Sequence, residues 1–138
     1  MAAVLATLTG LTTTGSNASR NYTNPFDDSI SDGLHVVMGS DNPVDNANNN
    51  FAYLDSELEI IVLTHTKNAT PETQINLIKK EVILALMADR TQGLSFVWDT
   101  VELGWSQPEI SGEGEKPTAM CEGRFSIKYR RSYTDASA

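Results

Sequence analysis

An alternation of apolar and polar residues near the end of the chain constrains the fold more than any other feature. From Ala119 to Tyr129 the odd positions are apolar or small, and the even positions are mostly polar or charged. Successive side chains of a β-strand point to opposite faces, so this period of two predicts a strand with one dry and one wet face. Cys121 is the chain's one cysteine and falls on the dry side, where we expect a buried, unreactive thiol.

A long amphipathic helix is predicted over about Pro71–Asp89. Thr70 suits the N-cap, Pro71 suits the first helical position, and Glu72 places negative charge in the first turn. Four apolar residues then recur at spacings of three and four and form one stripe: Ile75, Ile78, Val82 and Leu86. Leu77, Ile83 and Leu84 widen it. The stripe predicts that the helix packs on the sheet.

The remaining patterns complete a single domain over residues 1–138. A short helix is expected near the N-terminus, where the apolar residues lack the basic region of a secretory signal. Further strands are predicted at 34–38, 51–66 and 94–105, mobile loops at 40–50 and 108–117, and a frayed tail at 132–138. The strands that flank the second loop are long enough to pair as an antiparallel hairpin. Together these features predict an α+β fold with a mainly antiparallel sheet of about four or five strands.

The sequence carries no constellation that predicts catalysis, a cofactor or a metal ion. His35 and His65 each stand within a predicted strand and lack partners at metal-ligand spacing. Nucleophile-elbow, phosphate-loop and dinucleotide-binding motifs do not occur. Asp41 and Asp45 resemble the start of a calcium loop, but the EF-hand spacing and its closing glutamate are missing. We therefore expect a protein that is not an enzyme and that needs neither cofactor nor metal.

Charge is distributed unevenly along the chain. The net charge is −8, and residues 1–66 hold eight acidic residues against one arginine. This balance argues against a nucleic-acid-binding protein, which would present a basic face. The acidic half can be a solvated surface, or a surface that repels polyanions or meets a basic partner. No apolar run is long enough to span a bilayer.

Basic residues and one tryptophan are the candidate interaction residues. Arg124, Lys128 and Arg130 share the wet face of the last strand, where they can bind phosphate or meet the acidic face of a neighbouring copy. The acidic first half favours the second interpretation, as in a ring with heterologous contacts. Trp98 is expected in the core. Trp105 is expected at a rim, either as an interface anchor or as a partly buried loop residue.

The order of these patterns resembles a known family. An apolar N-terminal segment leads into Leu11-Thr12-Thr13-Thr14-Gly15-Ser16-Asn17, and Arg20 and a short apolar strand follow. A long strand then ends in Ile60-Ile61-Val62-Leu63, the capped helix follows, and the last strand reads Gly-Arg-Phe-Ser-Ile-Lys-Tyr-Arg. From about Leu5 to Arg131 the chain resembles the tail terminator proteins of long-tailed bacteriophages, the family of the lambda minor tail protein U.

The resemblance implies a structural role in a virion. Proteins of that family form a hexameric ring at the end of the finished tail tube and join the tail to the capsid. The implied partners are copies of the chain, the major tail tube protein and a head-completion or connector protein. DNA would pass through the ring without specific binding, and no membrane is involved. The loop at 40–50, with Asp41 and Asp45, becomes a candidate for reaching the lumen or the tube. The open alternatives are another small virion protein, such as a head-completion protein or capsid subunit, and a binding module for nucleic acid or a small ligand.

Overall fold

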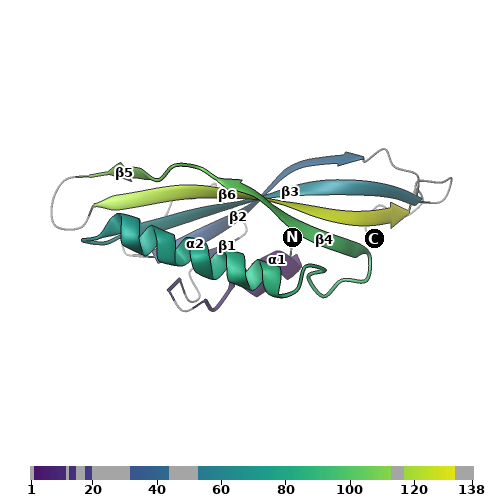
Figure 1. Cartoon of the computed structure of the whole chain (residues 1–138), viewed down its shortest axis with the longest axis horizontal. Helices are drawn as coiled ribbons and strands as arrows, with labels where there is room; N and C mark the ends of the chain where they lie inside the picture. The colour runs from purple at the N-terminus through teal and green to yellow at the C-terminus, as the bar shows by residue number, and fades with distance from the viewer. Residues whose placement is uncertain are drawn as a thin grey trace.

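The structure, a computed structural model, describes residues 2–11, 13–14, 18–19, 32–43, 53–112 and 117–132. Two helices and six strands lie in these ranges and confirm the predicted α+β class (Figure 1). In chain order they are α1 (Ala2–Leu8), β1 (Ala18–Ser19), β2 (Asp32–Pro43), β3 (Tyr53–Lys67), α2 (Pro71–Ala88), β4 (Val97–Trp105), β5 (Glu109–Ser111) and β6 (Thr118–Ser132).

The strands form one mainly antiparallel sheet. The strand order is β1-β2-β3-β6-β4, and β5 also pairs with β6. Only the short β1–β2 pair is parallel among these described pairs. β3 and β6 are the central strands and pair along their whole length, from Tyr53 opposite Ser132 to Lys67 opposite Thr118 (Figure 1). The predicted antiparallel pairing of the strands before and after the 108–117 segment is also present, as β4 with β6.

Helix α2 covers one face of this sheet, and α1 lies beside it (Figure 1). The predicted stripe of α2 is fully or almost fully buried, and so are Ala119, Cys121, Phe125 and Ile127 of β6, whereas Tyr129 is partly buried. Phe125 of β6 and Ile60 of β3 stand opposite each other in the ladder and both face the helix side. Burial of such side chains contributes roughly 1.5–3 kcal/mol each, so this layer is the main source of stability.

The start of α2 differs in detail from the prediction. Thr70 occupies the N-cap position, but its side chain makes no capping hydrogen bond. Its hydroxyl and its backbone N–H instead donate to the side-chain oxygen of Asn68, at 3.3 and 3.0 Å. Pro71, whose ring fixes a helical φ, therefore begins the helix without a side-chain cap.

Both predicted loops are shorter than expected where the structure describes them. Residues 40–43 continue β2, because after a bulge between Met38 and Asp41 the ladder resumes and Pro43 pairs with Ser56. Residues 44–50 lie outside the described ranges. In the second loop, Glu109–Ser111 form β5, which pairs with the start of β6 as a hairpin, and residues 113–116 lie outside the described ranges. The predicted tail begins at Ser132, which is the last residue of β6, and residues 133–138 are not described.

The prediction that Trp98 lies in the core is wrong, whereas Trp105 is partly buried, which is one of the two environments expected for it, although it lies in β4 and not in a loop. Trp98 is 42% exposed, whereas Trp105 is half-buried and packs against the core. The cause is a bulge in β4 between Val97 and Asp99, which leaves Val97 and Thr100 as the inward residues and turns Trp98 outward. Sequence alternation alone cannot reveal such a bulge.

Candidate interaction surface

The outer face of the sheet, opposite the helices, carries a row of cross-strand ion pairs. Acidic residues of β3 stand beside basic residues of β6, because the antiparallel register places the two rows next to each other. The pairs are Asp55–Arg130 at 2.9 Å, Glu57–Lys128 at 3.8 Å and Glu59–Arg124 at 2.6 Å, and we call them the ion-pair ladder. Arg124 also contacts Glu122 of its own strand, at 2.6 Å.

The ladder has one buried end and a more exposed middle. The Asp55 side chain is only 4% exposed, whereas those of Glu57 and Lys128 are 43% and 44% exposed. Exposed ion pairs contribute about 0–1 kcal/mol, but a buried carboxylate that loses a charged partner is costly. Among the pairs of the ladder, disruption of Asp55–Arg130 is therefore expected to lower the free energy of unfolding most. Arg130 also lies over the ring of Trp98, with its guanidinium carbon 5.2 Å from the ring centroid.

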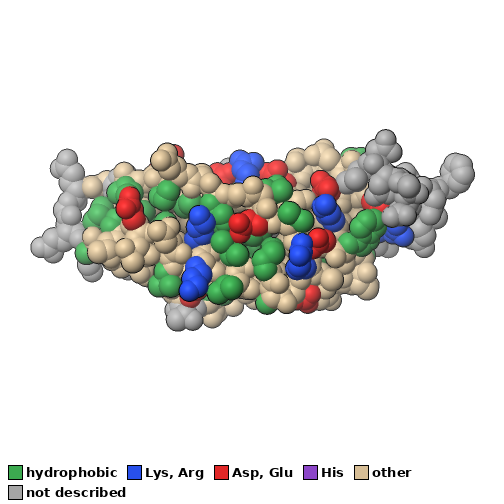
Figure 2. All heavy atoms as spheres, in the orientation of Figure 1, with side chains coloured by type: hydrophobic (Ala, Val, Ile, Leu, Met, Phe, Trp, Pro, Cys, Tyr) green, Lys and Arg blue, Asp and Glu red, His purple; other side chains and the backbone are tan. Residues whose placement is uncertain are grey.

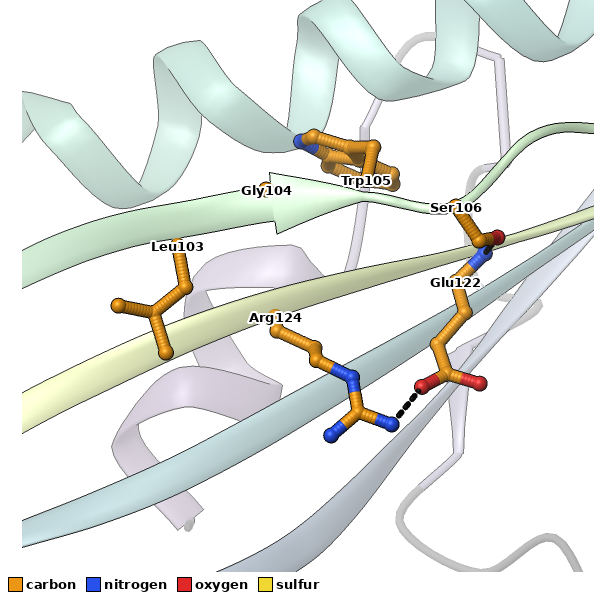
Figure 3. Close-up of a pocket in the computed structure, with 6 residues that line it drawn as sticks. All are labelled: Leu103, Gly104, Trp105, Ser106, Glu122 and Arg124. Atoms are coloured by element: carbon orange, nitrogen blue, oxygen red, sulfur yellow. Dashed lines mark hydrogen bonds and ion pairs between the residues drawn. The ribbon is translucent and has the colours of Figure 1, made fainter.

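Trp105 points away from this outer face. Figure 3 shows its ring on the α2 side of β4, opposite Leu103 and Arg124. The ring meets Phe125 edge to face, with centroids 6.0 Å apart, and Lys79 of α2 lies 5.5 Å from its centroid. Trp105 therefore packs between sheet and helix. A hollow of about 470 Å³ lies at this end of β4 and is lined by Leu103, Gly104, Trp105, Ser106, Glu122 and Arg124.

The structure brings together only part of the predicted set. Arg124, Lys128 and Arg130 share one face, as predicted from their alternation, but each lies within ion-pair distance of an acid in the same chain. Asp41 is exposed on β2 and accepts a hydrogen bond of 2.6 Å from the Tyr129 hydroxyl. Asp45 lies outside the described residues. The basic row is thus neutralised internally, which the sequence did not reveal because the partners are more than sixty residues away.

Two buried histidines lie on strands β2 and β3. Burial lowers the pKa of His35. Burial also lowers the pKa of His65 most strongly, the charges of His35 and Lys67 add to this effect, and Asp32 opposes it. Both imidazoles are therefore expected to be neutral near neutral pH.

Several large apolar side chains are exposed, which sequence reasoning missed. Leu77 and Leu84 were expected to widen the buried stripe of α2, but they are 45% and 60% exposed. They lie on the side of the helix that faces away from the sheet, because α2 buries only its narrow stripe. Trp98, Leu103, Ile110, Met120 and Met38 are also more than 40% exposed. On the face in Figure 2, hydrophobic side chains lie among acidic and basic ones, and neither sign of charge dominates.

Within the described ranges, no group of three or more His, Cys, Asp or Glu side chains is placed to hold a metal ion. None of the described helices has the length and apolar character that a membrane crossing requires. No protein-family model matches the chain, and no curated protein sequence is significantly similar to it.

Proposed function

We propose that this chain is a structural subunit of a bacteriophage tail, a tail terminator that assembles with its own copies into a hexameric ring. The ring sits at the head-proximal end of the tail tube and joins the tube to a connector protein of the capsid. The subunit acts without catalysis and without a cofactor. The sequence resemblance suggests this role, and the described surface supports it.

The observation that carries the proposal is the ion-pair ladder. A subunit through whose ring DNA must slide should not offer cations that can bind phosphate, since such contacts add affinity for any polyanion. Here Arg124, Lys128 and Arg130 are each paired with a carboxylate of the same chain. Together with the net charge of −8, this pairing disfavours retention of DNA. The same pairing weighs against the alternative of a nucleic-acid-binding module on that face.

The proposal is tested by interrupting the reading frame in the phage that carries it and imaging the particles. We expect filled heads and tails that are not joined, and a plasmid copy of the chain should restore joined virions. Normal virions without the chain would overturn the proposal.

A gold label on the chain separates the alternatives, because a signal over the capsid shell would indicate a head protein instead of a tail terminator.

A further inference from the structure

The outward side of α2 carries an apolar stripe with one basic residue. Its exposed members follow spacings of three and four, and they are Thr73, Leu77, Lys80, Leu84 and Ala88. Leu77 and Leu84 are two helical turns apart, about 10 Å along the axis. Lys80 lies between them and has no ion-pair partner in the part of the chain that the structure describes.

This stripe is poorly suited to bind itself. It contains no acidic residue, so two copies of α2 packed together would bring Lys80 near Lys80 of the other copy. Like charges placed opposite each other at an interface are costly. A surface that complements this stripe must be apolar and must carry a carboxylate that can pair with Lys80.

The β4 edge of the sheet has that chemistry. β4 is the outermost strand next to β6, and a bulge between Glu102 and Gly104 sets Leu103 out of the ladder. Leu103 is 56% exposed, and Glu102 is exposed and has no ion-pair partner among the described residues. Glu102 stands opposite the inward-facing Phe125, whereas Leu103 lies on the outer side with Arg124 (Figure 3), so the two side chains flank the β4 edge and a helix laid along that edge can contact both.

The edge is also unsuited to pairing with another strand. β4 has two irregularities, between Val97 and Asp99 and between Glu102 and Gly104. Bulges of this kind twist an edge and interrupt the row of backbone groups that an added strand would need. Contacts at this edge are therefore expected to be made by side chains.

We propose that the α2 stripe of one copy, at Leu77, Lys80 and Leu84, binds the β4 edge of a second copy, at Glu102 and Leu103. Leu103 packs between the two leucines, and Glu102 pairs with Lys80. Charge complementarity favours this occupant. The basic residues near β4 are already engaged within the chain, because Lys79 lies over Trp105 and the others pair with carboxylates: Arg90, Arg124, Lys128 and Arg130. The two surfaces differ, so the contact is heterologous and repeats from copy to copy. The inference rests on the proposed ring and specifies its interface.

Cross-linking between two single variants of the full chain tests the contact. Leu84→Cys and Leu103→Cys chains are purified separately and then mixed at millimolar concentration with a short bismaleimide. We expect a cross-linked dimer in the mixture and none in either variant alone, because the contact pairs position 84 with position 103. The native Cys121 is buried and is present in every sample, so the wild-type chain gives the background. Ser40→Cys in β2, which lies on the other side of the central strands from β4, replaces Leu103→Cys as the geometric control.

Charge reversal gives the specific readout. Adding Lys80→Glu to the Leu84→Cys chain should lower the cross-linking yield about tenfold, and Glu102→Lys in the partner chain should restore it. A mixture without dimer above background, or a yield that does not respond to Lys80→Glu, would overturn the inference. Either result leaves the proposed function standing if the wild-type chain still forms rings. If the proposed function itself is wrong, phage that lack the chain will form normal virions.

Discussion

The indole ring of Trp105 lies directly against the backbone of Gly123. The two residues are opposite each other in the β4–β6 ladder, and a Cβ at position 123 would stand 2.7 Å from two ring carbons. The absent side chain lets the ring lie flat on the sheet beneath α2, where Lys79 contacts it. Gly123 therefore determines how the edge strand β4 packs, through the Trp105 ring, against α2.

Gly123→Ala is expected to destabilise the protein by about 1–3 kcal/mol, because the added methyl group overpacks the site. Urea unfolding followed by tryptophan fluorescence and circular dichroism measures the change. Trp105→Leu removes the ring, so the double variant should lose less stability than the sum of the two single variants. Wild-type stability in Gly123→Ala would contradict this packing.

The two ends of the ion-pair ladder should respond differently to mutation. Arg130→Ala is expected to cost about 3–5 kcal/mol, because the buried Asp55 carboxylate loses this partner. Lys128→Ala is the matched control in the same strand and should cost less than about 1 kcal/mol, because its pair is exposed. Chemical denaturation of both variants checks the difference. Equal losses would mean that burial does not distinguish the pairs.

Acid should weaken the fold through the two histidines. Burial lowers the pKa of His35 and His65 below the ordinary value of 6.5, so the unfolded chain binds more protons than the folded chain below that pH. The free energy of unfolding should therefore fall as the pH drops through 6.5, and level off below the pKa of the folded state. Unfolding curves between about pH 8 and pH 5 measure this. His65→Gln should flatten the dependence, and an equally steep curve in that variant would count against the assignment.

Thr70→Ala should change stability by only a few tenths of a kcal/mol, although N-cap replacements typically cost about 1 kcal/mol. The reason is that the Thr70 hydroxyl bonds to Asn68 and not to the helix backbone. Asn68→Ala should cost more, because the Asn68 oxygen accepts both bonds that order the turn. Thermal unfolding of the two variants decides between them, and a full cap penalty for Thr70→Ala would refute the observed geometry.

Periodic patterns predicted the secondary structure well. Local interruptions of those patterns limited what the sequence predicted about side-chain orientation and strand ends. The α2 stripe and the alternation of β6 identified their buried faces, because burial on one face is what creates such periods. The bulges at Trp98 and near Asp41 break the period of two, so the outward turn of Trp98 and the extension of β2 to Pro43 went unpredicted. The neutralisation of Arg124, Lys128 and Arg130 was hidden for another reason. It depends on the register between β3 and β6, which no local pattern encodes.

The mass of the particle that the full chain forms on its own tests the central claim most directly. Native mass spectrometry, with negative-stain images of the same sample, should show one closed species of about 90 kDa, six copies of 15.0 kDa, with a central hole. An open-ended series of oligomers without a closed member, or a chain that stays monomeric even when isolated tail tubes are added, would contradict the account.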